Sequence, residues 1–147
     1  NKATLDYYVE LIDNKLLDYP LKAELQGQVV EAMEYSLQAG GKRLRPVLML
    51  EILPYVGECQ PEKYAEIACS IELIHTFSLI HDDLPCMDDD DYRRGKPSCH
   101  KAFPENIALL AGDALNTLLF EVIANSAMNG VISADKCYAY FLFLQEQ

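Results

Sequence analysis

Aspartates are concentrated in one short stretch of this chain, HDDLPCMDDDDYRRGKP at residues 81–97, and six of the ten residues at 82–91 are aspartates. Carboxylates placed this close together repel one another in a folded chain. A divalent cation would neutralise them, and Mg²⁺ commonly combines one or two carboxylates with phosphate oxygens. The cluster therefore predicts a Mg²⁺–diphosphate site, with a solvated acidic loop as the alternative.

The spacing of the aspartates leaves the second metal ligand open. Asp82 and Asp88 are six residues apart, so they do not share a face of an unbroken helix. Pro85 lies between them, and proline removes a backbone donor and bends or breaks a helix. A bulge at this proline would bring Asp88 round to Asp82. Without a bulge, Asp89 is the natural partner of Asp82.

Basic residues follow a glycine pair in the stretch AGGKRLRP, residues 39–46. Glycines allow close approach of the backbone, and a helix start favours anions. Lys42, Arg43 and Arg45 would add positive charge at such a site. The stretch is not a P-loop, because the gap between the glycines is missing and no Ser or Thr follows the lysine. Ordinary surface cations at a helix start are the alternative.

A second basic stretch, YRRGKPSCHKAF at residues 92–103, directly follows the aspartates. Arg93 and Arg94 are suited to bind the diphosphate oxygens that a metal leaves free, because guanidinium groups donate forked hydrogen bonds. His75 shares a helical face with Asp82 and would be a further donor. Salt bridges from these cations to residues 89–91 are the alternative.

The elements that position these residues are predicted to be helical, because helical periodicity dominates and strand alternation is nearly absent. The expected helices cover residues 4–18, 26–38, 46–54, 61–83 and 106–128, and a last helix begins near Ser133 as N-cap. The helices at 61–83 and 106–128 are apolar over much of their circumference and are expected to be central. We predict an all-α fold and a single domain over residues 1–147.

The composition narrows the class of partner. The formal net charge of −11 (12 Lys and Arg against 23 Asp and Glu) disfavours nucleic acid and anionic membrane surfaces. The five cysteines are scattered and form no CxxC pair, which favours free thiols in a reducing compartment over disulfides or zinc. The first twenty residues read as an amphipathic helix and not as a signal or transit peptide. No apolar run is expected to span a membrane, so we expect a cytoplasmic protein.

Three stretches, in this order and spacing, resemble the trans-isoprenyl diphosphate synthases, specifically the bacterial-type farnesyl/geranylgeranyl diphosphate synthases. They are GGKRLRP, ELIHTFSLIHDDLPCMDDDDYRRGKPSCHKAF and LLAGDALNTLLFEVIA. The resemblance covers residues 35–124, and DDxxxxD followed by RRGKP is its most specific part. It implies an isoprenoid synthase-type helical bundle, truncated here to the N-terminal helices.

The resemblance also implies a role for each matched residue. The catalytic aspartates of the motif would be Asp82, Asp83 and Asp88. The ligands of the cofactor Mg²⁺ would be Asp82 and Asp88. The diphosphate of isopentenyl diphosphate would be bound by Lys42, Arg45, His75 and Arg94. Arg93 would meet the allylic diphosphate.

The implied reaction is the head-to-tail condensation of isopentenyl diphosphate with dimethylallyl or geranyl diphosphate. Phe77 and its neighbour Ser78 match the positions that limit product length in the family. A phenyl ring there predicts farnesyl diphosphate, with a C20 product as the alternative. The family is dimeric, and the apolar helix around residues 115–123 is the expected homodimer contact.

The family's second aspartate-rich motif lies further along than these 147 residues reach, and residues 128–147 match nothing catalytic. The chain is therefore expected to be the N-terminal part of a polyprenyl synthetase and inactive alone. A non-catalytic subunit that binds or regulates a partner is the alternative function.

Overall fold

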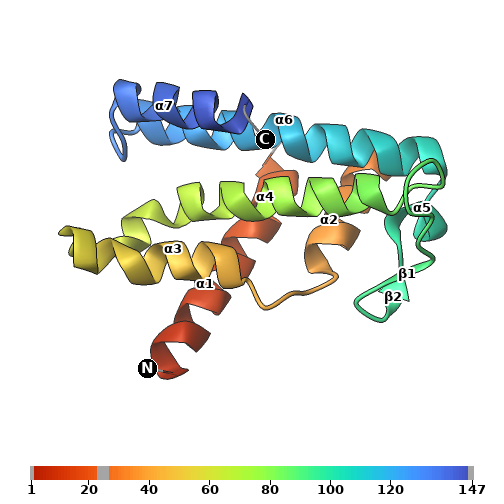
Figure 1. Ribbon diagram of the computed structural model, residues 1–147, viewed down its shortest axis with the longest axis horizontal. Helices are drawn as coiled ribbons and strands as arrows, with labels where there is room; N and C mark the ends of the chain where they lie inside the picture. The colour runs from red at the N-terminus through yellow and green to blue at the C-terminus, as the bar shows by residue number, and fades with distance from the viewer. Residues whose placement is uncertain (1, 23–26, 146–147) are drawn as a thin grey trace.

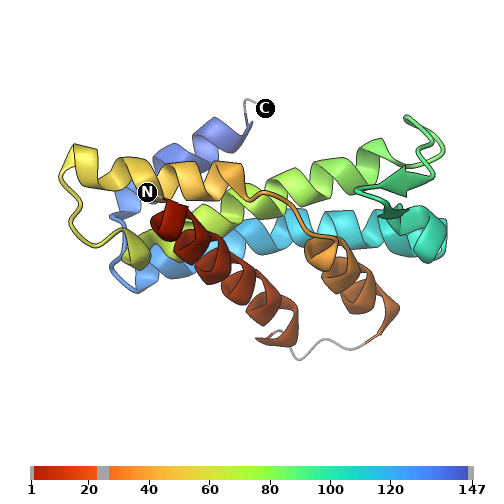
Figure 2. The ribbon, with the colours of Figure 1, turned by 90° about the horizontal axis from the view of Figure 1, so that it is seen from below.

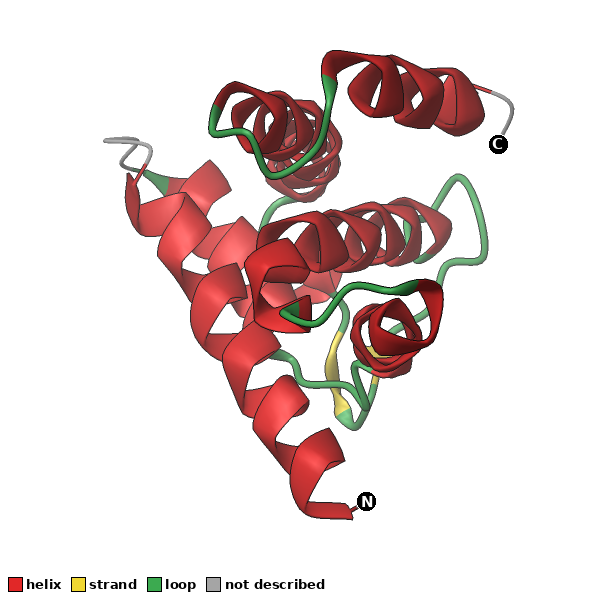
Figure 3. Ribbon diagram, turned by 90° about the vertical axis from the view of Figure 1, so that its left-hand side faces the viewer, coloured by secondary structure: helices red, strands yellow, loops and turns green. Residues whose placement is uncertain are grey.

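The computed structural model describes residues 2–22 and 27–145 of the chain. In this part the fold is all-α, as predicted, apart from one short hairpin (Figure 3). The long helices are α1 (Lys2–Lys22), α2 (Gln28–Gln38), α3 (Leu44–Ile52), α4 (Ala65–Asp82), α6 (Glu105–Met128) and α7 (Ala134–Gln145). The shorter elements are the 3-10 helices η1 (Leu53–Val56) and η2 (Pro61–Tyr64), the strands β1 (Tyr92–Arg93) and β2 (Lys96–Pro97), and the helix α5 (Cys99–Ala102).

The predicted helices agree with these bounds except at their ends. The expected helix at 61–83 begins as the 3-10 turn η2 and becomes α-helical only at Ala65. Ser133 caps α7 as predicted, because its side-chain oxygen accepts a hydrogen bond from the Lys136 N–H at 3.3 Å. The predicted start of the second helix at residue 26 lies outside the described residues. The hairpin and α5 were missed by the sequence analysis.

The centre of the molecule is the pair α4 and α6, which pack along each other (Figures 1 and 2). Helices α1 and α3 pack on α4, and α2 packs on α6, so α4 is enclosed on several sides. This explains why α4 is apolar around much of its circumference. The fully buried apolar side chains come from several helices: Ile12, Leu16, Leu37, Leu50, Leu73, Leu115, Leu119 and Ile123.

Helix α6 corrects one expectation. It has 24 residues and is long and apolar enough to cross a membrane, by length and composition alone. The helix is not an uninterrupted apolar run, because Asp113 and Glu121 lie within it. In the structure Leu115, Leu119 and Ile123 are buried within the protein. Packing in the core therefore accounts for the apolar face of this helix.

Arg43 joins three helices at the entrance to α3. Its side chain is buried and donates from Nε to Asp13 Oδ1 (2.7 Å), from Nη1 to Glu72 Oε1 (2.8 Å) and from Nη2 to the Leu37 carbonyl (2.6 Å). Burial lowers the pKa of Arg43, but the hydrogen bonds to Asp13 and Glu72 outweigh it and raise the pKa above its ordinary value. The backbone of Arg43 is left-handed, with φ of 47°. The Arg43 guanidinium is therefore buried and committed to these three partners.

We expect Arg43→Ala to lower the free energy of unfolding by roughly 3–5 kcal/mol, because it leaves the buried carboxylate of Glu72 without its partner. Asp13→Ala is the matched control, since Asp13 is 44 % exposed and its pairing should contribute about 1 kcal/mol or less. Urea unfolding of the polypeptide that carries these residues measures both. Equal losses in the two variants would contradict the central role of Glu72.

Candidate active site

The aspartate stretch begins where α4 ends. After Asp82 the chain turns back at Leu84 and Pro85, and the N–H of Asp88 donates to the carbonyl of Asp82 at 2.8 Å. The N–H of Asp89 donates to the Leu84 carbonyl at 3.1 Å and closes the same turn. The backbone at Asp88 is thereby brought next to Asp82, although the two residues are six apart in sequence.

Asp88 and Asp89 differ in their surroundings. Asp89 has a left-handed backbone, with φ of 52°, and its carboxylate lies 3.8 Å from Nε2 of His100. Asp88 is exposed beside the half-buried Asp82. In the described part of the chain, no three His, Cys, Asp or Glu side chains form a group that could hold a metal ion. A metal on Asp82 and Asp88 therefore needs further ligands, such as phosphate oxygens.

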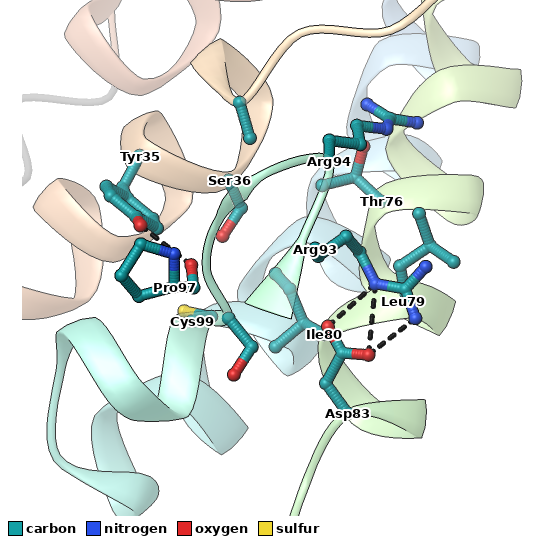
Figure 4. A pocket seen from close by; sticks show the side chains of 12 residues that line it. Tyr35, Ser36, Thr76, Leu79, Ile80, Asp83, Arg93, Arg94, Pro97 and Cys99 are labelled. Carbon is teal, nitrogen blue, oxygen red and sulfur yellow. Dashed lines mark hydrogen bonds and ion pairs between the residues drawn. The ribbon is translucent and has the colours of Figure 1, made fainter. Parts of the chain in front are cut away.

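Asp83 faces a different partner from its neighbours. Its buried carboxylate accepts hydrogen bonds from Arg93 Nε, at 2.7 and 3.0 Å, and from Arg93 Nη2 at 2.5 Å (Figure 4). The hydrogen bond to Asp83 is the main cause of the raised pKa of Arg93. Nη2 of Arg93 also lies 3.7 Å from Asp90. Asp83 thus fixes Arg93 beside the aspartate stretch.

The two arginines are carried by the hairpin β1–β2, in which Tyr92 pairs with Pro97 and Arg93 with Lys96. Arg94 and Gly95 form its two-residue turn and have φ of 54° and 78°. Two positive φ angles are typical of a type I′ turn, which matches the twist of the strands. Arg94 accepts a conformation that costs a non-glycine residue about 1–2 kcal/mol. Such strain is found at functional positions.

Four of the predicted anion-binding residues meet in a cavity of about 440 Å³ between the 39–45 stretch, α4 and the hairpin. They are Lys42, Arg45, His75 and Arg94. We call this space the basic cavity. Glu72 and the inward-turned Arg43 also line it.

The glycine pair at the basic cavity has two separate roles. Gly40 has φ of 82°, and a Cβ there would meet no neighbouring atom within 4 Å, so only its backbone conformation requires glycine. A Cβ on Gly41 would lie 2.6 Å from Nη1 of Arg94. Gly41 therefore leaves room for the Arg94 guanidinium against the backbone.

The positive groups of the basic cavity are crowded. Burial is the main cause that lowers the pKa of His75, and the nearby Arg45 lowers it further against the opposing effect of Glu72. Loss of hydration also lowers the pKa of Arg94, with smaller contributions from Arg43, Arg93 and Arg45. A bound anion would offset both the loss of hydration and the mutual repulsion of these groups, so the cavity is suited to an anionic ligand.

A larger, mainly apolar cavity of about 900 Å³ lies between α4, α6 and α7. Its lining includes Ile71, Ile74, Phe77, Ser78, Leu119, Phe120, Tyr140, Phe143 and Leu144. Arg45 and His75 line both this apolar cavity and the basic cavity, so the two spaces adjoin. Phe77 and Ser78, which the resemblance links to product length, lie in this cavity, whereas the packing of the predicted last helix, α7, against it was not foreseen. The aromatic run at residues 138–143 was the available signal.

Gly112, in the stretch LLAGDALN, allows α6 to approach the end of α4. A Cβ on Gly112 would clash with the imidazole of His81. His81 Nε2 lies 3.1 Å from the Leu109 carbonyl, and its ring packs edge-on against Phe77 with centroids 4.9 Å apart. This contact links the residue before Asp82 to the central helix and was not foreseen from the sequence.

The sequence model of the polyprenyl synthetases matches residues 26–142. The chain belongs to the polyprenyl synthetase family. Among curated relatives, the farnesyl diphosphate synthase of Bacillus subtilis is 50 % identical over 125 residues, which cover 85 % of this chain and 42 % of that protein. The chloroplastic heterodimeric geranylgeranyl pyrophosphate synthase large subunit 1 of Arabidopsis thaliana is 52 % identical over 122 residues, covering 82 % and 32 %.

Two solved structures have the same fold as this chain. The geranyltranstransferase of Thermotoga maritima superposes with a TM-score of 0.78 and 40 % identity, covering 95 % of this chain and 52 % of that one. The geranyltransferase of Legionella pneumophila superposes with a TM-score of 0.82 and 39 % identity, and the match covers 95 % of this chain and 48 % of that one. The chain thus spans less than half of the curated relatives named here. The family and the isoprenoid synthase-type fold predicted from the motifs are confirmed.

We expect Gly41→Ala to weaken the binding of inorganic pyrophosphate several-fold, because the new methyl group displaces the Arg94 guanidinium. Its effect on stability should be small, since that guanidinium is the end of a flexible side chain. Gly40→Ala is the matched control and should lose about 1–2 kcal/mol of stability through its positive φ. Calorimetric titration and thermal unfolding of both variants test this assignment. Unchanged affinity in Gly41→Ala would place the anion away from Arg94.

Proposed function

We propose that this chain is part of a short-chain trans-prenyltransferase that uses Mg²⁺. The reaction is the condensation of isopentenyl diphosphate with dimethylallyl or geranyl diphosphate. The observation that carries this proposal is the junction of a basic cavity, an apolar cavity and a pair of aspartates at the end of α4. The names of the relatives, farnesyl and geranylgeranyl diphosphate synthases, support it.

Each diphosphate has its own set of residues in this proposal. Lys42, Arg45, His75 and Arg94 hold the diphosphate of isopentenyl diphosphate in the basic cavity. Asp82 and Asp88 hold Mg²⁺, which when bound withdraws electrons from the allylic diphosphate and favours its departure. Arg93, oriented by Asp83, donates hydrogen bonds to the same leaving group.

The bond changes in this proposal are those that the family resemblance implies. The C1–O bond of the allylic diphosphate breaks, and the electron pair leaves with the diphosphate. The double bond of isopentenyl diphosphate attacks C1 through its C4, and a proton passes from C2 to the released diphosphate. Arg45 and His75, which line both cavities, place the two substrates against each other. The apolar lining of the larger cavity excludes water from the carbocation.

Asp83 has a supporting role in this proposal. The sequence analysis grouped it with the catalytic aspartates, but its carboxylate is 2 % exposed and is engaged by Arg93. A buried carboxylate committed to a guanidinium has little capacity left for a metal ion. Asp83 therefore acts by orienting Arg93, and Asp82 and Asp88 remain the proposed ligands.

We also propose a cytoplasmic homodimer. The predicted contact at residues 115–123 needs revision, because Leu115, Leu119 and Ile123 are buried inside the protomer. Among the apolar side chains that α6 exposes, Leu109 and Leu110 line neither cavity and are the better candidates for a dimer contact. All five cysteines are unpaired, which suits a reducing compartment.

Product length is proposed to depend on Phe77, which lines the apolar cavity on α4. Its ring is held edge-on by His81, so it forms a stiff wall that shortens the space for a growing chain. This supports farnesyl diphosphate as the product, with a C20 product as the alternative.

The metal assignment predicts that Asp82→Asn lowers kcat by a factor on the order of 10³ in the polypeptide that carries these residues, because it removes a ligand that acts on the leaving group. Arg45→Met should mainly raise KM for isopentenyl diphosphate. Asp135→Asn, on the exposed start of α7, is the control and should leave both constants unchanged. Steady-state kinetics with radiolabelled isopentenyl diphosphate decides. Full turnover in Asp82→Asn would overturn the assignment.

The product-length proposal predicts that Phe77→Ala lengthens the product by at least one isoprene unit, because removal of the ring enlarges the apolar cavity. Phe103→Ala is the matched control, since Phe103 packs on Tyr35 and neither ring lines that cavity. Chromatography of the dephosphorylated products compares the chain lengths made by the wild type and by the two variants. The same chain lengths in wild type and Phe77→Ala would show that the limit lies elsewhere.

A further inference from the structure

His100 is a buried histidine next to the aspartate stretch. Its side chain is 3 % exposed, and its Nδ1 lies 3.1 Å from the hydroxyl of Ser98, which is itself buried. Among the described residues, its Nε2 has no hydrogen-bond partner. A buried polar atom left without a partner costs about 1–3 kcal/mol, so it needs an explanation.

The nearest charged group to this nitrogen is Asp89, whose Oδ1 lies 3.8 Å away. Asp89 is 61 % exposed and has the left-handed backbone that ends the turn after α4. The preceding residue, Asp88, is tied to Asp82 by its backbone N–H. The position of the Asp89 side chain therefore constrains how Asp88 is presented to Asp82.

Helix α5 supports the aspartate stretch at a second point. Lys101 Nζ lies 2.8 Å from Asp91 Oδ1, and the Ser98 N–H donates to the Asp91 carbonyl at 2.9 Å. Hydrogen bonding to Lys101 lowers the pKa of Asp91. The distance from Lys101 to Asp91 is that of a hydrogen bond. The distance of 3.8 Å from His100 Nε2 to Asp89 Oδ1 is too long for one.

We propose that His100 is a positioning residue for the metal-binding aspartates, an inference that rests on the proposed function. We assign the ring proton to Nε2, which makes the Ser98 hydroxyl the donor to Nδ1. Nε2–H then donates to Asp89 when Mg²⁺ and diphosphate draw the loop together. Asp89 is held by this bond and presents Asp88 to the metal, as outer partners do at other metal sites.

Two substitutions of His100 separate the two ring nitrogens. The amide of His100→Gln reaches the place of Nε2 and can still donate to Asp89. The amide of His100→Asn reaches only the place of Nδ1 and keeps the contact to Ser98. Asp89→Ala removes the other partner and lies on the surface, where it does not threaten folding.

The readout is the Mg²⁺ dependence of inorganic pyrophosphate binding, measured by calorimetry on the polypeptide that carries these residues. We expect the half-saturating Mg²⁺ concentration to rise about tenfold in His100→Asn and in Asp89→Ala. His100→Gln should stay close to the wild type. His100→Asn should have no further effect when Asp89 is already alanine. Pyrophosphate binding without Mg²⁺, at the basic cavity, should be the same in all variants.

Several results would overturn the inference. Equal Mg²⁺ dependence in wild type and His100→Asn would remove the role of His100. A loss in Asp89→Ala far larger than in His100→Asn would make Asp89 a metal ligand. Equal losses in the Asn and Gln variants would show a packing effect. If wild-type binding and turnover do not depend on Mg²⁺, the proposed function itself fails, and this outcome is distinct from the others.

Discussion

The arrangement of the site depends on the three hydrogen bonds of Arg43. They join Asp13 of α1, the Leu37 carbonyl of α2 and Glu72 of α4 at one buried guanidinium. A guanidinium is expensive to bury, and only this degree of pairing makes its position favourable. With Arg43 turned inward through a left-handed backbone, its neighbours Lys42 and Arg45 are left to line the cavity. The fixed side chain of Arg43 thereby helps to set the positions of Lys42 and Arg45.

The repulsion within the aspartate stretch is resolved by division of the carboxylates among different partners. Asp83 is neutralised by Arg93, Asp91 is paired with Lys101, and Asp89 lies near His100. Asp82 and Asp88 are left at the turn, where their backbones meet. Two roles were considered for the basic residues that follow the aspartates, namely salt bridges to the cluster and anion binding, and the structure is compatible with both. Some are salt-bridge partners of the cluster, and Arg94 faces the basic cavity.

The sequence allowed the helices to be predicted because their signals are local. The apolar pattern of α6 and the capping serine of α7 lie within the segments that they describe. The hairpin was missed because strands of two residues have no periodicity. In addition, arginine is not a residue type that predicts a left-handed turn. The Asp83–Arg93 pair and the burial of Arg43 depend on contacts between segments. The meeting of Lys42, His75 and Arg94 was implied by the resemblance and could not be derived from spacing.

The basic cavity lies in a chain with a formal charge of −11. An anion that approaches these 147 residues is therefore repelled by their net charge and attracted only close to the cavity, within a Debye length of about 8 Å at physiological salt. For these 147 residues we therefore expect the association rate of free anions to rise as salt screens the repulsion, the reverse of ordinary electrostatic steering. A ligand that arrives already complexed with Mg²⁺ carries less charge and meets a lower barrier. In the proposed reaction, Mg²⁺ would therefore affect the encounter rate as well as the departure of the leaving group.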